Sequence, residues 1–276
     1  MLNFCSLYSG STGNCLFVKS NNTNLLIDAG VSLKKIEQSL EYLEINPYKI
    51  SGILITHEHS DHIKSIGNIS KKYNIPIFTN LETWNAIGED QKQKVSPNNV
   101  NYFSIDKKFI IGDIEILPFS IPHDAANPCG FNLYNNSSKI SIATDLGHIT
   151  PEILKNLEYS SFIMLESNYE PEILKFSRYP YVLKKRIDGP NGHLSNVLAG
   201  QTISKLVPYG LKSVMLGHLS KENNFPELAF RTVLEQLSKN KISNENICLN
   251  VANRNAPSPF INIAWQLISI GGSVEE

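Results

Sequence analysis

Short, largely apolar runs separated by small polar residues mark the first part of the chain. The segments between these runs are rich in Ser, Gly, Thr and Asn, which is typical of tight turns between strands. Apolar residues then recur every three or four positions over residues 33–43, which predicts a helix, and a continuous apolar run at 50–55 predicts a buried strand. The strands predicted before that helix lie at residues 2–7, 15–18 and 25–27.

The rest of the chain continues this mixture of strands and helices. Apolar runs in the middle predict strands at residues 100–103, 114–119, 131–134 and 140–143. In the last third, helical spacing predicts helices at 194–206 and 226–237. Further strands are predicted at 213–216 and, closing a sheet, at 261–268. Two strand-rich halves, each with its own helices, indicate an α/β fold with two mixed β-sheets face to face and helices outside.

Length and composition favour one folded unit. With 276 residues, no internal repeat, no low-complexity block and no Gly/Ser- or Pro-rich linker, we expect a single domain over residues 1–276. Hydrophobic residues make up 41% of the chain, yet no stretch is long and apolar enough for a membrane helix. The N-terminus lacks the basic flank and apolar region of a secretory signal, so we expect a cytoplasmic protein with no membrane partner.

Charge and cysteine usage exclude further classes. The formal net charge is −1, which excludes a protein that binds polyanions through a positive charge spread over its whole surface. Any contact with a nucleic acid must therefore be made by a local group of cationic residues. The four cysteines form no Cys-x-x-Cys pair, which argues against a zinc ribbon or a dithiol redox site. We expect all of them to be buried, namely Cys5, Cys15, Cys129 and Cys248.

Three of the seven histidines fall within six consecutive positions, directly after the strand predicted at 50–55, in the motif THEHSDH at residues 56–62. His57 and His59 stand two apart, so in extended backbone both imidazoles point to one side and can share a metal ion. Asp61 and His62 follow after the chain has turned and can reach a second ion. A histidine-rich surface loop is the alternative, but this spacing rarely arises by chance.

The motif resembles the signature of the metallo-β-lactamase fold superfamily, whose members fold as a four-layer αββα sandwich that holds two metal ions at one edge. The resemblance spans most of the chain and implies that Asp28 supports the metal loop through hydrogen bonds. Two divalent ions, either Zn²⁺ or Mn²⁺, suit such His and Asp donors. The implied ligands are His57, His59 and His123 for the first ion, Asp61, His62 and His218 for the second, and Asp145 as a bridge between them.

Differences between this sequence and the motifs of individual branches indicate which branches of the superfamily it does not resemble. The diiron branch places an acid where His59 stands, and zinc β-lactamases are normally exported and often use a Cys ligand. Thioester hydrolases of the glyoxalase type lack a counterpart to the last third of this chain. No long insertion separates Asp145 from the last motifs, so we do not expect the extra domain that RNase J and CPSF proteins carry there.

The C-terminal motifs favour a nuclease branch. GHLSN at residues 192–196 and GHLS at 217–220 resemble tRNase Z, where a catalytic histidine precedes a helix and a strand that ends in the final ligand. The resemblance to the bacterial YycJ/VicX/WalJ family is stronger and includes SGSTGNC at 9–15, LESNY at 165–169 and GHLSKENN at 217–224. That family is associated with DNA exonuclease activity of the 5′-to-3′ kind.

His193 is a candidate general acid that protonates the departing 3′-oxygen, with Glu166 orienting it. The alternative is a histidine that only precedes a helix capped by Ser195. Asp61 is assigned to catalysis as well as to metal binding. We assign no role to His148.

Two segments are candidates for substrate contacts. The turn at residues 9–14 can offer backbone N–H groups and hydroxyls to phosphate, or it can be a simple tight turn. Residues 173–187 carry five cationic side chains and no acid, interleaved with aromatic residues, which suits a phosphate backbone and a stacked base, or else a solvated helix face. The residues assigned to substrate binding are Ser11, Thr12, Asn14, Lys184, Lys185, Arg186 and Asn223.

Together these features predict a two-metal phosphodiesterase, specifically a DNA exonuclease with nucleic acid as its partner. A hydroxide bridging the ions would attack phosphorus while His193 assists the leaving group. Two rival hypotheses are a hydrolase of a small thioester, lactone or cyclic phosphodiester, and a metal-containing regulatory or scaffold protein without turnover.

Overall fold

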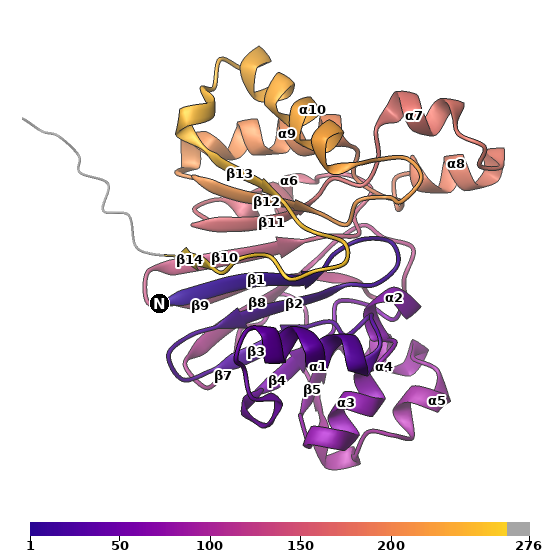
Figure 1. The fold of residues 1–276 in the computed structure, drawn as a ribbon, viewed down its shortest axis with the longest axis vertical. Coiled ribbons are helices and arrows are strands. Elements are labelled where there is room, and N and C mark those ends of the chain that lie inside the picture. The colour runs from indigo at the N-terminus through magenta and orange to yellow at the C-terminus, as the bar shows by residue number, and fades with distance from the viewer. Residues whose placement is uncertain (264–276) are drawn as a thin grey trace, which may run out of the picture.

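Two seven-stranded sheets face each other in the computed structural model, which describes residues 1–263 (Figure 1). The strand orders are β14-β1-β2-β3-β4-β5-β6 and β13-β12-β11-β10-β9-β8-β7. The first sheet contains β1 (Leu2–Tyr8), β2 (Cys15–Lys19), β3 (Asn24–Ile27), β4 (Gly52–Leu54), β5 (Ile77–Thr79), β6 (Val100–Tyr102) and β14 (Ile261–Ile263). The second contains β7 (Phe109–Ile111), β8 (Ile114–Ser120), β9 (Cys129–Asn135), β10 (Ser138–Ala143), β11 (Phe162–Glu166), β12 (Ser213–Gly217) and β13 (Cys248–Val251).

Both sheets are mixed, as expected. In the first, β14, β1, β2 and β3 pair antiparallel, and β3 to β6 pair in parallel. In the second, β7 to β10 pair antiparallel, and β10 to β13 pair in parallel. Parallel neighbours require crossover connections, and most of these contain helices.

The helices cover the outer faces of both sheets. Ile36 of α1 and Ile69 of α3 pack on the first sheet, and Ile203 of α9 and Val233 of α10 pack on the second. The predicted four-layer αββα sandwich is therefore confirmed. The helices are α1 (Leu33–Tyr42), α2 (Ser60–Ile63), α3 (Ile66–Tyr73), α4 (Leu81–Ala86), α5 (Glu89–Lys92), α6 (Pro151–Leu157), α7 (Pro171–Phe176), α8 (Tyr181–Ile187), α9 (Asn196–Leu206) and α10 (Pro226–Lys239).

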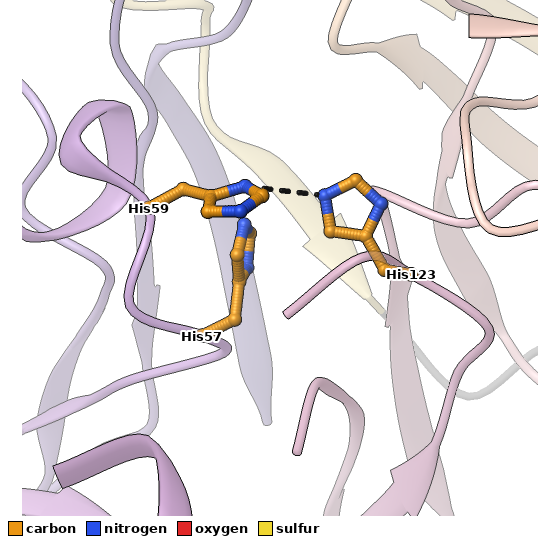
Figure 2. Close-up of side chains that lie close together, drawn as sticks. All are labelled: His57, His59 and His123. Atoms are coloured by element: carbon orange, nitrogen blue, oxygen red, sulfur yellow. Dashed lines mark hydrogen bonds between the residues drawn. The ribbon is translucent and has the colours of Figure 1, made fainter. Parts of the chain in front are cut away.

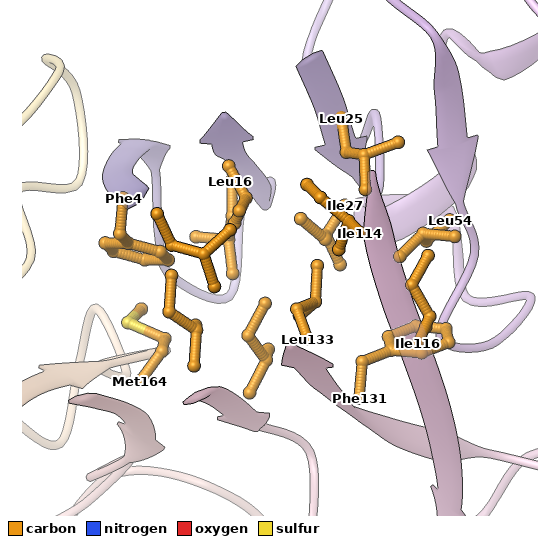
Figure 3. Packing of buried hydrophobic residues seen from close by; sticks show 14 of the residues in the cluster. Phe4, Leu16, Leu25, Ile27, Leu54, Ile114, Ile116, Phe131, Leu133 and Met164 are labelled. Atoms are coloured by element: carbon orange, nitrogen blue, oxygen red, sulfur yellow. The ribbon is translucent and has the colours of Figure 1, made fainter. Parts of the chain in front are cut away.

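The inner faces of the two sheets share one apolar core (Figure 3). Phe4 and Ile27 of the first sheet belong to the same cluster as Ile116, Leu133 and Phe131 of the second, and all five are fully buried. Burying one such side chain stabilises the fold by about 1.5–3 kcal/mol. This shared core fixes the position of one sheet relative to the other, and with it the positions of the loops at the sheet edges.

The strands and helices predicted from the hydrophobic pattern are present, with some bounds shifted. The run at 50–55 yields only the three residues of β4, and the strand predicted at 261–268 is β14 as far as Ile263, its remainder lying outside the described residues. Short elements such as β5 and α4 were not predicted. The prediction that all four cysteines are buried was wrong, because Cys248 lies on β13, an outermost strand, and is exposed.

Within residues 1–263, no helix combines the length and the apolar character needed to cross a membrane. The loops that matter for chemistry lie at one edge of the sandwich. Because β10, β11 and β12 run in parallel, their carboxyl ends reach the same edge, which is where binding sites of parallel sheets form. Asp145, Glu166 and His218 stand at or just after these strand ends.

Candidate metal centre

Three histidines from two loops form the first group of possible metal ligands (Figure 2). His57 and His59 follow β4, and His123 follows β8. Their ligating atoms lie within 4.8 Å of one another, and Nδ1 of His59 is 3.3 Å from Nε2 of His123. The three rings therefore converge as they would around a shared cation.

Asp61, His62 and His218 form a second group, with their ligating atoms again within 4.8 Å of one another. Nε2 of His62 and Nε2 of His218 each lie 3.6 Å from Oδ2 of Asp61. Helix α2 begins at Ser60, so the chain turns between His59 and Asp61, as expected. This turn separates the first pair of donors in the motif from the second pair.

Asp145 lies between the two groups. Its Oδ2 is 3.3 Å from Nε2 of His62, and its Oδ1 is 3.8 Å from Nε2 of His123. The same Oδ1 is 3.3 Å from Nδ1 of His218. One buried carboxylate thus contacts members of both groups, which is the position that a bridging ligand requires.

Asp28 holds the metal loop from the neighbouring strand β3. Its Oδ1 accepts the backbone N–H of Thr56 at 2.9 Å, and its Oδ2 accepts the Thr56 hydroxyl at 2.8 Å and lies 2.7 Å from Nδ1 of His62. Two residues later, a Cβ on Gly30 would stand 1.5 Å from the carbonyl oxygen of Asp61, so only glycine fits beneath the loop. The predicted supporting role of Asp28 agrees with these contacts.

Three residues of the centre have left-handed backbone, namely Asp28 at φ 63°, Asp145 at φ 60° and His218 at φ 54°. Each follows a strand and turns its side chain sharply into the site. For a residue such as histidine this conformation costs about 1–3 kcal/mol and persists where the surroundings hold it. Here the hydroxyl of Ser9 accepts the backbone N–H of His218 at 2.8 Å.

Burial and neighbouring charges shift the pKa values of the histidines in this site in different directions. Burial would lower the pKa of His218, but Asp145, Asp61 and Glu166 raise the pKa to about 10. Burial, together with the neighbouring His62, holds the pKa of His57 well below its usual value. His57 is therefore a neutral imidazole with a lone pair available to a cation.

The donor set fits two divalent cations. His57 Nε2, His218 Nε2 and Asp145 Oδ2 are buried, and none has a hydrogen-bond partner among the described residues. Buried polar atoms are normally paired, so three unpaired atoms in one cluster call for an additional partner. Imidazole nitrogens and carboxylate oxygens are donors that suit Zn²⁺ and Mn²⁺.

His193 and Glu166 form a pair beside these groups. Nδ1 of His193 lies 2.9 Å from Oε1 of Glu166 and 3.8 Å from Oδ1 of Asp145. Burial would raise the pKa of Glu166, but His193 and His218 lower the pKa to about 2, so the carboxylate stays ionised. Since Nδ1 of His193 faces Glu166, Nε2 is the nitrogen left to serve a substrate.

The alternative interpretation of His193 as a residue preceding a helix is compatible with this pairing. The Ser195 hydroxyl accepts the backbone N–H of Leu198 at 3.3 Å and caps α9. The His193 side chain is nonetheless 20% exposed, whereas Glu166 is fully buried. His148 is exposed, lies outside these groups, and has its Nδ1 2.8 Å from the carbonyl oxygen of Pro190.

Some of the residues assigned to substrate binding are exposed in the structure, and others are buried. Ser11 and Thr12 are exposed and line a groove of about 430 Å³ together with Asp61. Asn14 is buried, and its Nδ2 lies 3.0 Å from Nε2 of His62, so it contacts the metal ligands. Asn223 is also buried, and its Nδ2 donates to the Ser220 hydroxyl at 3.4 Å, which places it behind the surface that a substrate would meet.

The basic segment forms the helices α7 and α8. Arg186 is brought to the centre, where its Nε donates to Oδ2 of Asp124 at 2.5 Å, directly after His123. Lys184 lies on another part of α8 and donates from Nζ to the carbonyl oxygen of Lys175 at 2.8 Å. Of the three cations assigned, Arg186 is therefore the one linked to the ligand loop.

Several supporting residues were not predicted. Asn168 donates from Nδ2 to the carbonyl oxygen of His218 at 2.7 Å, and Arg254 donates from Nη2 to the carbonyl oxygen of Leu219 at 3.0 Å. Thr56 lies within the predicted motif, so its place before His57 was a usable signal. Arg254 comes from a distant loop, and no local pattern in the sequence points to it.

Comparisons with known proteins agree with this geometry. The sequence model of the metallo-beta-lactamase superfamily matches residues 8–194. The chain is 37% identical to exodeoxyribonuclease YycJ of Bacillus anthracis, over 86% of this chain and 90% of that protein. It is 36% identical to exodeoxyribonuclease WalJ of Streptococcus pneumoniae, over 84% of this chain and 87% of that protein.

Solved structures share the fold at low identity. The metallo-beta-lactamase fold protein YhfI from Bacillus subtilis superposes with a TM-score of 0.68 at 15% identity, over 93% of this chain and 98% of that one. The short form of human tRNase Z superposes with a TM-score of 0.66 at 14% identity, over 96% of this chain and 100% of that one. At such identities the likeness concerns the fold alone.

Proposed function

Because the chain belongs to the metallo-beta-lactamase superfamily, and within it to the family of the YycJ and WalJ exodeoxyribonucleases, we propose that it is a metal-dependent phosphodiesterase that degrades DNA from strand ends. The observation that carries the proposal is the His193–Glu166 pair, 3.8 Å from the Asp145 carboxylate. The pair places a histidine that can donate a proton beside residues of the types that bind metal ions.

The ligand groups have distinct places in this proposal. His57, His59 and His123 would hold one divalent cation, either Zn²⁺ or Mn²⁺, and Asp61, His62 and His218 a second, with Asp145 contacting both. When bound, such a pair of ions polarises phosphoryl oxygens and lowers the pKa of water. The protein contributes the fixed orientation of its rings, through the contacts of Asp28 and Glu166.

His193 has the role of general acid. Water loses a proton to solvent and adds to phosphorus, the bond from phosphorus to the 3′-oxygen breaks, and the proton on Nε2 of His193 passes to that departing oxygen. His193 then takes up a proton from solvent. Glu166 keeps Nδ1 of His193 engaged, so the ring presents Nε2 to the leaving group. The products are a released 3′-hydroxyl and a 5′-phosphate.

Exposed residues around the centre are proposed to hold the strand. Arg186 stands beside the ligand loop through Asp124, and Ser11 and Thr12 line the groove next to Asp61. The 5′-to-3′ direction is proposed on the family resemblance alone. Phosphate contacts of this kind make binding fall steeply with salt.

A panel of end-labelled substrates tests the proposal. Single-stranded and double-stranded DNA and RNA, labelled at either end, are incubated with the protein loaded with Zn²⁺ or Mn²⁺ separately. We expect mononucleotides released progressively from the 5′ end of DNA. Hydrolysis of a thioester, a lactone or a cyclic phosphodiester without hydrolysis of DNA would overturn the proposal.

A further inference from the structure

A small pocket of about 240 Å³ lies where α10 begins, outside the metal centre. Its walls come from the turn between β1 and β2, the loop after β12 and the loop between β13 and β14. The last of these loops passes beside the turn, where a Cβ on Gly10 would stand 3.0 Å from Nη1 of Arg254 (Figure 1). The volume is below the range of about 300–1,000 Å³ that is usual for small-ligand sites, so the pocket suits a single chemical group.

The charged side chains that line the pocket are both cationic, namely Lys221 and Arg254. Among residues 1–263, no acid belongs to its lining, and the neighbouring Glu222 is exposed outside it. Helix α10 begins at Pro226 in the wall and has no side-chain cap, so the positive end of its dipole adds to these charges. The pocket therefore favours an anion.

Arg254 has a buried donor without an acceptor. Its Nη2 donates to the carbonyl oxygen of Leu219 at 3.0 Å, whereas Nη1 is buried and has no hydrogen-bond partner among the described residues. Burial lowers the pKa of Arg254, and the opposing effect of Glu222 is smaller. Leaving a buried charged donor unpaired is costly, so Nη1 calls for an acceptor that the described part of the chain does not supply.

Ser9 connects the pocket to the metal centre. Its hydroxyl accepts the backbone N–H of His218 at 2.8 Å, and this bond leaves the hydrogen of the hydroxyl free to be donated. Leu219, which lines the pocket, directly follows His218, so their Cα atoms are about 3.8 Å apart. The turn at residues 9–14 also lines the groove beside Asp61. The pocket is therefore adjacent to the loop that carries the last of the proposed metal ligands.

We propose that this pocket binds a phosphate group, in addition to the one that is cleaved at the metal centre. Guanidinium, ammonium and hydroxyl groups are the usual partners of phosphate oxygens. A free nucleotide carries such a group, and so does each linkage of a DNA strand. The position beside His218 favours a linkage of the DNA that is held at the metal centre, and this source of the phosphate rests on the proposed function.

Uncharged linkages identify the phosphate. With the metal-loaded protein, KM is measured for duplex DNA in which one methylphosphonate replaces a phosphodiester at successive positions of either strand. For the wild type, one position other than the cleaved bond should raise KM by roughly 10- to 100-fold, the range expected for lost hydrogen bonds to a charged group. In the double variant Lys221→Gln/Arg254→Gln, KM for unmodified DNA should rise by a similar factor, and that position should have no further effect.

Two comparisons separate phosphate binding from a structural role of Arg254. In the double variant, the slope of log KM against log salt concentration should decrease by about 1, because one phosphate contact is lost. The ratio of kcat/KM for DNA to kcat/KM for bis(4-nitrophenyl) phosphate should also fall, whereas a purely structural role would lower both values and leave their ratio constant. Lys221 is exposed, so Lys221→Gln alone should fold and show the same changes to a smaller extent.

Lys239→Gln is the matched control. Lys239 is exposed at the other end of α10, about 20 Å from Pro226, and its substitution removes the same charge. This variant should keep the wild-type salt slope and the wild-type ratio.

Equilibrium binding of deoxyadenosine monophosphate distinguishes the two sources of the phosphate. A flat scan, a position that stays sensitive in the double variant, or an unaltered salt slope would exclude the strand. One more nucleotide bound per chain in the wild type than in the double variant would then assign the pocket to a free nucleotide, and equal binding would overturn the inference. A wild-type protein that hydrolyses neither DNA nor bis(4-nitrophenyl) phosphate would overturn the proposed function, while the comparison of nucleotide binding would still test the pocket.

Discussion

Nδ1 of four histidines in the centre is engaged by a neighbouring group, which leaves Nε2 to face the other ligands. The partners are the Thr56 hydroxyl for His57, Asp28 for His62, the Gly192 carbonyl for His123 and Glu166 for His218. His59 differs, because its Nδ1 faces His123. Fixing the ring in this way sets which nitrogen is available and makes it a better donor to a metal.

Asp28→Asn should weaken metal binding by about 10- to 100-fold. The backbone N–H of Thr56 bonds to Oδ1 of Asp28, whereas His62 Nδ1 bonds to Oδ2. An amide has only one acceptor oxygen, so it cannot accept at both of these positions. A competition titration against a chromophoric chelator measures the affinity. Asp106→Asn is the control, because Asp106 is exposed and shares the left-handed backbone at φ 60°. Equal affinities in the two variants would remove Asp28 from the metal centre.

His193→Ala should lower kcat by about 10²- to 10⁴-fold while the metal content stays unchanged, because the residue is placed as a proton donor and not as a ligand. Steady-state hydrolysis of labelled DNA and metal analysis of the same sample measure both quantities. His148→Ala removes an exposed histidine and should leave kcat unaltered. Loss of metal from His193→Ala would instead identify His193 as a ligand.

At the scale of elements, a buried polar network explains the asparagines of the C-terminal motifs. Asn196 and Asn224 bond to each other, and Asn196 also donates to Glu170 at 2.9 Å. Asn224 donates to the backbone carbonyls of Ser167 and Asn168. Thr232 of α10 also donates to Glu170, so the network joins the loops after β11 and β12 to α9 and α10. These asparagines support the site from behind and do not face a substrate.

The pattern of apolar residues predicted the longest strands and helices but only some of the short elements. Strands such as β8 and β9 carry seven residues each, whereas β5 and β7 carry three, which is too few for a recognisable period. The three-residue strands β4 and β6 were predicted because each lies within a longer run, at 50–55 and 100–103. Helix α8 carries exposed Tyr181 and Val182 and has no buried residue, so it lacks the apolar face that predicts a helix. Its position depends on tertiary contacts.

Asp113→Asn should destabilise the fold near neutral pH and not in acid. The Asp113 carboxylate, between β7 and β8, accepts hydrogen bonds from Ser20 and Thr23 in the turn between β2 and β3 and so links the two sheets. Burial would raise the pKa of Asp113, but these hydrogen bonds lower it below its ordinary value. The stabilisation is thus present above the unfolded pKa of about 3.9 and is lost as the pH falls through the folded pKa.

Thermal unfolding measured from pH 7 to pH 3 tests this link. At pH 7 the Asp113→Asn variant should be less stable by about 1 kcal/mol, which corresponds to a Tm lower by about 2–4 °C. The difference from the wild type should be constant above about pH 4 and should shrink as the pH falls below the unfolded pKa of about 3.9, and Asp106→Asn should show no such dependence. A difference that is constant across this range would exclude the carboxylate as its origin.

At the scale of the whole molecule, the metal centre joins two sheets that are far apart in sequence. His57 to His62 follow a strand of the first sheet, whereas His123, Asp145 and His218 follow strands of the second. The local motif alone indicated the first four donors. The remaining donors were predicted from the order of motifs in a resembling family, because no local pattern brings residues 123, 145 and 218 together.

The net charge of −1 conceals a local asymmetry. Helix α8 ends in Lys184, Lys185 and Arg186 beside a centre rich in carboxylates. Averaging over the chain removes this contrast. In the proposed function, these cations are the local charge that holds the anionic strand on an almost neutral protein.

We propose that one centre holds two ions through Asp145 and that both ions are needed to cleave phosphodiester bonds. The most direct measurement is the number of metal ions per chain, determined by mass spectrometry of the wild type and of Asp145→Ala with their DNA hydrolysis recorded on the same samples. We expect two ions per chain in the active wild type, and fewer ions without hydrolysis in a folded Asp145→Ala. A wild type that is fully active with one ion, or an Asp145→Ala protein that keeps both ions and full turnover, would contradict it.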